Sequence, residues 1–335
     1  MPGYLDIGLA LVCAGLVGFT IQRGGICLVG AVDDIIHKGQ WRTARGIVVA
    51  VAAAAAVYAL LHLTTGVELY PITLPLGAEV VVGGVLLGIG ACVNGACTLG
   101  SIARFGSGQW SFAAMPVGLF IGCLTANDVL PHPWLTEPVR RAPHGADHLA
   151  PFVATAGVLA LVWFVVRHRH WRPSVPLTEA VFHRRWNQAA TTLVLIGLWV
   201  TLTQLVGPWA YPDLTFDLST GHPHRVALVV SLTLATFTIA VVAGRTGRNW
   251  SPVRVRSSDL VRRRVGGFIR GFGIRMLTRG NGRLTLIGLP FLVGDAIVAM
   301  LCLSVTISLI VWATRNARFS VATSRNGSPA GPGSP

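Results

Sequence analysis

The stretch GGVLLGIGACVNGACTLGSIARFG, at residues 83–106, combines an apolar, glycine-rich run with an internal break. Gly84 and Gly88 lie four residues apart, so they share a helix face that a neighbouring backbone can approach closely. Asn94-Gly95 then interrupts the helix, and a second short apolar run follows. A break at membrane depth leaves free backbone amides at the start of the next helix, where they favour an anion. The alternative interpretation is a glycine-rich packing helix followed by an ordinary loop.

A second stretch, GGFIRGFGIRMLTRGNG at residues 266–282, repeats the glycine spacing of the first. The matching positions are Gly83, Gly84, Gly88 and Gly90 in the first copy and Gly266, Gly267, Gly271 and Gly273 in the second. The expected topology sends the two copies through the membrane in opposite directions. Because inverted repeats with broken helices are typical of transporters, we predict two inverted halves, at about residues 1–166 and 188–312.

The composition places the chain in a bilayer. Of its 335 residues, 52% are hydrophobic and only 12% are charged, with a mean hydropathy of +0.62; soluble domains carry roughly 25% charged residues. Nine segments approach the length of about 20 mostly apolar residues that a spanning helix needs. They lie at about 5–21, 44–64, 77–93, 111–130, 149–166, 188–206, 225–244, 265–278 and 284–312. We therefore predict an all-α, polytopic membrane protein with about nine transmembrane helices.

The net charge of +14 predicts orientation rather than nucleic-acid binding. The basic residues lie in short clusters between apolar runs and not along one soluble face. Most Lys and Arg fall in loops on one side, so the positive-inside rule places the N-terminus outside and the C-terminus in the cytoplasm. Residues 1–312 then form the membrane domain. Residues 313–335 form a small, polar tail that we expect to be disordered.

A second break lies near the N-terminus, in GFTIQRGGICLVGAVDDI at residues 18–35. One span ends at Arg23-Gly24-Gly25, and a short apolar run containing Cys27 closes at Asp33-Asp34. This run is too short to cross a bilayer. It forms either a re-entrant half-helix that lines a cavity or the continuation of the first helix to the surface, and periodicity favours neither.

The six cysteines all lie within or beside apolar segments, which argues against structural disulfides. Their spacing matches no metal or haem site, and the chain has no Walker A motif, so we expect no metal and no cofactor. A cysteine inside a membrane helix is usually a small apolar filler. Cys27 and Cys97 differ from the others because each follows a glycine break.

On these residues the chain resembles the YeeE/YedE family of sulfur-compound membrane proteins, whose characterised type is a thiosulfate permease. The resemblance rests on Gln22-Arg23 to Cys27 with Asp33-Asp34, on Gly84-Gly88-Gly90 leading to Gly95-Ala96-Cys97-Thr98-Leu99-Gly100, and on the second glycine copy ending near Gly280. It implies a bacterial plasma-membrane protein with nine spanning helices and short re-entrant helices in two pseudo-symmetric halves. It also implies a narrow pathway lined by thiols. The residues that it places along this pathway are Cys27, Cys92, Cys97, Gly90, Gly95, Thr98, Gly280 and Asn281.

One departure from the family pattern lies in the second copy, where the pattern expects a cysteine at Gly280. The local sequence Thr278-Arg279-Gly280-Asn281-Gly282-Arg283 lacks that thiol. We expect Arg279 and Arg283 either to attract anions at the pathway mouth or to anchor the helix at the headgroups. Asp295 is a charge inside the ninth segment, so it is either functional or a buried partner of Arg275 or Arg270.

The leading functional hypothesis is a permease that imports a small, thiosulfate-like sulfur anion, and not an enzyme. Protonated thiols would donate weak hydrogen bonds to the terminal sulfur of such an anion. Two alternatives stay open: a membrane sulfurtransferase that forms a persulfide on Cys97, and a non-transporting membrane subunit. The partners are the anion and membrane lipid, and the resemblance adds a cytoplasmic TusA-like sulfur carrier.

Overall fold

The computed structural model describes residues 4–65, 73–130, 176–207, 209, 211–212, 223–247 and 250–326. Every regular element in these ranges is a helix. The helices of the first half are α1 (Tyr4–Gly24), α2 (Leu28–Lys38), α3 (Arg42–Thr65), α4 (Ala78–Asn94), α5 (Thr98–Gly106), η1 (Trp110–Ala113) and α6 (Ala114–Val129). Those that follow are α8 (Leu177–Phe182), α9 (Gln188–Val206), α11 (Pro223–Thr246), α12 (Ser257–Leu277), α13 (Asn281–Arg283), η3 (Leu284–Gly288) and α14 (Gly294–Asn326).

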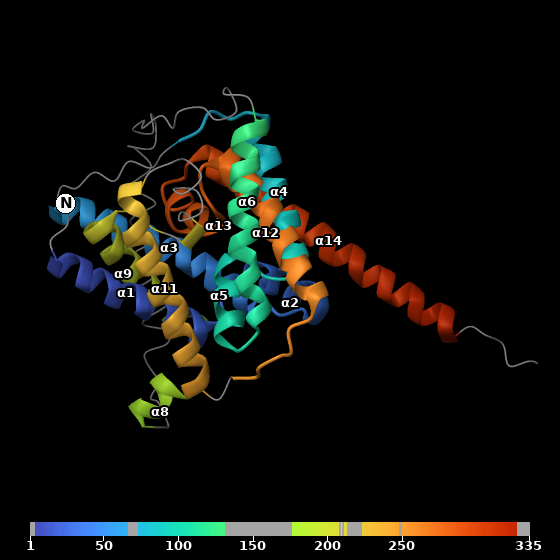
Figure 1. Ribbon diagram of the computed structural model, residues 1–335, viewed down its shortest axis with the longest axis horizontal. Coiled ribbons are helices and arrows are strands. Elements are labelled where there is room, and N and C mark those ends of the chain that lie inside the picture. Colours follow the sequence, from blue (N-terminus) through green and yellow to red (C-terminus); the bar gives the residue numbers. More distant parts are fainter. Residues whose placement is uncertain are drawn as a thin grey trace, which may run out of the picture.

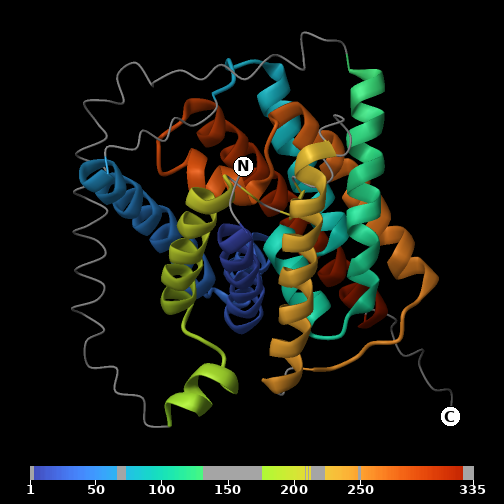
Figure 2. The same cartoon turned by 60° about the vertical axis from the view of Figure 1, so that its left-hand side comes forward.

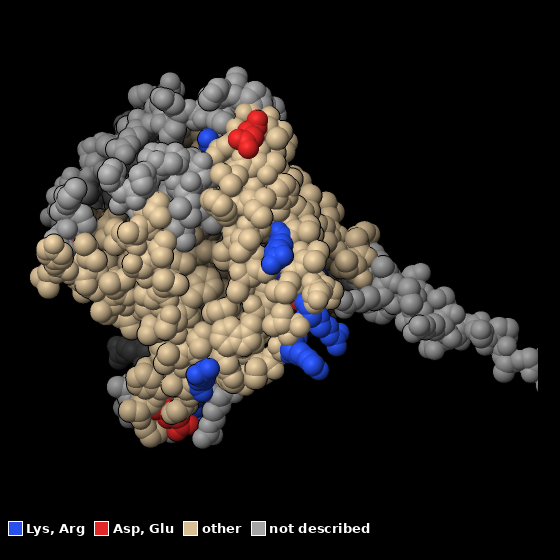
Figure 3. Space-filling view, viewed as in Figure 1, with Lys and Arg blue, Asp and Glu red and all other residues tan. Residues whose placement is uncertain are grey.

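Six segments of the described chain are long and apolar enough to cross a membrane. They are Tyr4–Lys38, Arg42–Leu60, Ala78–Gly106, Trp110–Val129, Val226–Thr246 and Gly294–Thr314. A shorter apolar helix, Ala190–Val206, lies at the predicted sixth segment. The predicted segment at 149–166 lies outside the described residues, and the segment at 265–278 falls within α12. The chain is therefore an all-helical, multi-pass membrane protein. The described part of the face drawn in Figure 3 carries few charged side chains, as is expected of a surface in contact with lipid.

The predicted continuous span at 284–312 is wrong. The helix η3 is a single π-helical turn, and it is followed by an irregular segment. The helix α14 begins only at Gly294. Pro290 lies in the break and cannot donate a backbone hydrogen bond, and Leu292 adopts a left-handed φ of 51°. At its other end α14 continues past residue 312 to Asn326, into the segment that we expected to be a disordered tail.

The longer helices pack as two groups with the short helices α2 and α5 between them (Figures 1 and 2). In one group α4 packs against α12 and α14, and α12 also packs against α6. In the other group α1 packs against α11 and α9, and α9 also packs against α3. The short helix α5 contacts α1 and α11 of the second group, while α2 contacts α3 and α14. The breaks that the sequence predicts therefore lie where the two groups meet.

The repeated glycines are the places where the helices touch. A Cβ atom on Gly83 would lie 2.8 Å from Leu277 Cγ, and one on Gly266 would lie 2.6 Å from the backbone nitrogen of Asn94. The start of α4 thus meets the end of α12, so the two helices run antiparallel. A Cβ atom on Gly84 would lie 2.7 Å from the carbonyl oxygen of Ala299 in α14. Glycine at these positions lets one backbone rest directly on another.

The second copy uses its glycines in the same way. A Cβ atom on Gly273 would lie 2.8 Å from the carbonyl oxygen of Gly83, again at the α4–α12 contact. On Gly267 and Gly271 it would run into the carbonyl oxygens of Met115 and Leu119 in α6. Each glycine-rich helix therefore has one glycine face for its partner helix and a second face for α14 or α6.

Candidate functional site

Three helices end in the same backbone conformation before a short helix begins. In each case a residue with a left-handed φ follows the first helix, one further residue follows, and the next residue caps the short helix. The left-handed residues are Gly25, Gly95 and Thr278, with φ of 63°, 75° and 53°. The capping residues are Cys27 before α2, Cys97 before α5 and Gly280 before α13. The predicted breaks at Gly25 and Gly95 are thus confirmed, and a third break of the same kind exists at Thr278.

The first two breaks bring their thiols together. The backbone nitrogen of Cys97 donates a hydrogen bond to Cys27 Sγ at 3.4 Å. The Sγ atom of Cys97 accepts a hydrogen bond from the backbone nitrogen of Gly100, also at 3.4 Å. A Cβ atom on Gly100 would lie 2.6 Å from Cys27 Sγ. The glycine at this position therefore leaves space for the thiol of Cys27. Two cysteines that are far apart in the sequence therefore share one site.

Arg270 reaches from α12 into the same region and is only 1% exposed. Its Nη1 donates to the carbonyl oxygen of Ala96 at 3.3 Å. Its Nη2 donates to Thr98 Oγ1 and, at 3.1 Å, to Asn281 Oδ1. Thr98 and Asn281 also hydrogen-bond to each other through their side chains. Gly90 makes room for this arrangement, because a Cβ atom there would lie 2.7 Å from the carbonyl oxygen of Gly266 and would crowd the Arg270 side chain.

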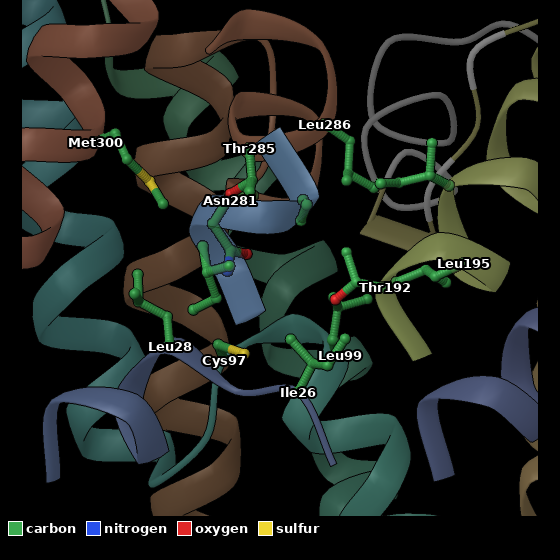
Figure 4. A pocket seen from close by; sticks show the side chains of 14 residues that line it. Ile26, Leu28, Cys97, Leu99, Thr192, Leu195, Asn281, Thr285, Leu286 and Met300 are labelled. Carbon is green, nitrogen blue, oxygen red and sulfur yellow. The ribbon is translucent and has the colours of Figure 1, made fainter. Parts of the chain in front are cut away.

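A small cavity of about 40 Å³ lies beside these residues. It is lined by Cys97, Asn281, Gly282, Thr192 and Thr285 together with apolar side chains, and Figure 4 shows Cys97, Thr192 and Asn281 around it. The apolar lining residues are Ile26, Leu28, Ile47, Ala50, Leu99, Leu195, Ile196, Leu286 and Met300. A single water needs roughly 10–15 Å³. The cavity is therefore large enough for a small ion and far too small for its full hydration shell.

Three other residues that we placed on the pathway, Cys92, Gly95 and Gly280, do not line the cavity. Cys92 lies on α4. Gly95 supplies the left-handed turn before Cys97, and a Cβ atom there would lie 3.0 Å from Arg263 Nη1. Gly280 has open space around it, because its nearest neighbour, Ile274 Cδ1, would be 3.7 Å from an added Cβ atom.

The partner predicted for Asp295 is wrong. Asp295 Oδ2 accepts a hydrogen bond from Arg279 Nη2 at 2.5 Å, and both side chains are buried. Arg275 instead donates to Asn127 Oδ1, while Arg270 binds Thr98 and Asn281. The carboxylate lies in the first turn of α14, where the helix dipole also favours a negative charge. Arg279 is therefore neutralised inside the protein, whereas Arg283 is half-buried.

The sequence predicts Arg270 only as a partner of Asp295, whereas the structure makes it a member of the site. A signal was present, because an arginine in the middle of a glycine-rich span is costly unless it has a function or partners. Its real partners, Thr98 and Asn281, lie on the two short helices that follow the second and third breaks.

The fold and the site define a class: multi-pass membrane proteins with a narrow, thiol-bearing cavity at the junction of broken helices. The model of the sulphur transport family matches residues 23–309, and the chain belongs to this family. It is 24% identical to the thiosulfate transporter TsuA of Escherichia coli K12 over 324 residues, which cover 81% of this chain and 85% of that protein. It is 29% identical to the probable transporter YedE of the same organism over 149 residues, 44% of this chain and 32% of that protein. The YeeE/YedE resemblance is thereby confirmed.

Proposed function

We propose that the protein is a permease that imports a small, thiosulfate-like sulfur anion through the cavity beside Cys97. The observation that carries this proposal is the meeting of two thiols, Cys27 and Cys97, at the starts of two short helices. The similarity to a protein named as a thiosulfate transporter supports the choice of substrate.

The chemistry of the cavity suits such an anion. Removing a dianion from water costs several kcal/mol even after relaxation, and the N-terminal amides of α5 offset part of this cost. The Cys97 sulfur already accepts a hydrogen bond from Gly100, which leaves its S–H proton to donate to the soft terminal sulfur of the ligand. Weak donors in succession favour permeation, because an ion that is held tightly does not leave.

The two inverted halves, at about 1–166 and 188–312, belong to the same proposal. The contact of α4 with α14 corresponds to that of α12 with α6, and the contact of α1 with α11 corresponds to that of α9 with α3. The antiparallel pairing of α4 with α12 also supports an inverted repeat. Gly207, with a φ of 83°, follows α9 as Gly25 follows α1. Such a repeat would place the broken helices at the bilayer midplane.

Orientation and partner follow from the charge distribution and from the family. We propose that the N-terminus lies outside and the C-terminus in the cytoplasm, because arginine-rich loops stay inside. The family suggests a bacterial plasma membrane and nine spanning helices. A cytoplasmic TusA-like sulfur carrier would then receive the sulfur at this side.

Uptake of labelled thiosulfate into proteoliposomes tests the proposal. We expect Cys97→Ala to reduce uptake by about five- to tenfold, because loss of a hydrogen bond in a dry site costs roughly 1–1.5 kcal/mol. Cys92→Ala is the matched control, since Cys92 lies outside the cavity, and it should keep wild-type uptake. Equal uptake by the two variants would contradict a pathway through Cys97.

The same preparation separates the other two functions. A sulfurtransferase would transfer the terminal sulfur of thiosulfate to the Cys97 thiolate and release sulfite, which leaves one added sulfur on Cys97 in a mass spectrum. A non-transporting subunit would be folded and would show neither uptake nor a persulfide.

A further inference from the structure

Arg270 is a buried cation, and no Asp or Glu side chain among the described residues forms an ion pair with it. Within the described ranges its side-chain hydrogen bonds go only to Ala96, Thr98 and Asn281, and its Nε has no partner. The buried carboxylate of Asp295 forms its ion pair with Arg279. A guanidinium held in a dry interior is expensive without a countercharge. A bound anion would supply this countercharge and would explain why a buried arginine is present.

The direction of each hydrogen bond in this cluster follows from the chemistry of the side chains. A guanidinium only donates, so Thr98 Oγ1 accepts from Arg270. The Thr98 hydroxyl proton then goes to Asn281 Oδ1, which also accepts from Arg270. The amide oxygen of Asn281 is thus fixed toward Arg270, and its amide nitrogen must lie on the opposite side.

That amide nitrogen is an unused donor at the cavity. Asn281 is 7% exposed and lines the cavity together with Cys97. Among the described residues its Nδ2 forms no hydrogen bond, while its side-chain oxygen and its backbone carbonyl are both engaged. A buried amide usually has its donors satisfied. Two N–H bonds therefore remain for a ligand.

We propose that Asn281 Nδ2 binds the oxygen-bearing end of the anion, and that Arg270 and Thr98 are positioning residues that fix and polarise this amide. The inference rests on the proposed function and deepens it. Cys97 offers a weak S–H donor suited to soft sulfur, whereas the amide offers N–H donors suited to oxygen. The cavity therefore selects small anions that carry a terminal sulfur and an oxyanion group in one molecule.

This arrangement also explains how a buried charge can serve transport. The positive charge of Arg270 acts on the anion through a neutral amide and a hydroxyl rather than through a direct ion pair. The anion is attracted into a medium of low dielectric constant but forms no salt bridge that it would have to break on leaving.

The test measures equilibrium binding of thiosulfate and sulfate to the purified full-length protein in detergent. Thr98→Val keeps the shape of the side chain but removes the hydroxyl, so we expect thiosulfate affinity to fall by about tenfold. Thr98→Ser should restore it, which a purely steric role would not require. Thr203→Val is the matched control, because Thr203 is also buried but lies outside the cavity, and its hydroxyl donates to the carbonyl oxygen of Trp199 in its own helix; this variant should bind as the wild type does. Asn281→Asp, which replaces the donor with a carboxylate, should abolish binding.

The outcomes decide the inference separately from the proposed function. Wild-type affinity in Thr98→Val would overturn the inference and leave the permease intact. Binding that depends on Thr98, without uptake into proteoliposomes, would support the inference and overturn the permease. Equal affinity of the wild type for sulfate and thiosulfate would overturn the selectivity for a terminal sulfur, and no binding of either anion would overturn the inference altogether.

Discussion

The break between α4 and α5 and the break between α12 and α13 follow the same backbone path with different side chains. Each has a left-handed residue after the helix, Gly95 in one and Thr278 in the other. The next residue is Ala96 in the first break and Arg279 in the second. The caps are Cys97 and Gly280. The first break therefore presents a thiol, while the second presents a buried ion pair and the amide of Asn281.

This difference shows that backbone shape and chemistry are set by separate residues. The shape depends on the glycine contacts of α4 and α12, which have the same spacing in both copies. The chemistry depends on the residues at the tip of each break, which differ. Three sets of substitutions test this division, and the expected effects decrease from the first set to the third.

The largest effect is expected at Arg279, the residue that makes the second break unlike the first. Arg279→Ala gives the second break the alanine that the first has at Ala96, but it leaves Asp295 buried without its partner. Breaking a buried ion pair in this way costs about 3–5 kcal/mol. Thermal unfolding of the purified protein measures the loss. The double variant with Asp295→Ala should recover part of it, and an additive double variant would show that the two charges do not interact.

A smaller loss is expected where the glycine contacts are tightest. Gly271→Ala would push a Cβ atom into the backbone of Leu119, which cannot rotate away, so we expect a cost of about 2 kcal/mol or more. Gly88→Ala should cost less, because its closest contacts, Thr306 Cβ at 2.7 Å and the carbonyl oxygen of Leu303 at 3.0 Å, lie farther away than the carbonyl oxygen of Leu119 does from a Cβ atom on Gly271. Gly197→Ala is the control, since nothing lies within 4 Å of an added Cβ atom there. Equal melting temperatures for all three would refute the role of the glycine faces.

The smallest effect on stability is expected at Gly280. Gly280→Cys adds a thiol at the cap of α13, where φ is −86° and the nearest atom would be 3.7 Å from the new Cβ. We expect a change within about 0.5 kcal/mol and thiosulfate uptake at least equal to that of the wild type. A large drop in melting temperature would mean that the space at this cap is less open than the contacts indicate.

The parts of the fold that repeat a local pattern could be predicted from the sequence. The breaks at Gly25 and Gly95 and the matching glycines of α4 and α12 are visible as short motifs, because glycine spacing reports helix contact directly. Pro290 could also have predicted the interruption near the start of the ninth segment. The apolar residues on both sides of Pro290 instead favoured one continuous span.

The chemistry of the site could not be predicted in the same way. Arg270, Thr98 and Asn281 belong to three different helices, and the spacing rules within one helix do not link residues across helix breaks. The same is true of Arg279 and Asp295: both charges are visible in the sequence, but the pairs predicted for Asp295 are wrong. Which arginine meets which acceptor depends on side-chain geometry that only the packed helices define.

The contact glycines and the caps also differ in how freely they can change over evolutionary time. Any base change that replaces glycine with another amino acid introduces a side chain, and at Gly266 or Gly273 that side chain has no room. Point mutations at the glycines that form the helix contacts should therefore seldom be tolerated. At Gly280 the open space admits a small side chain without moving the backbone. New substrate preferences in this architecture should arise at the tips of the breaks, one residue at a time, on a scaffold that stays the same.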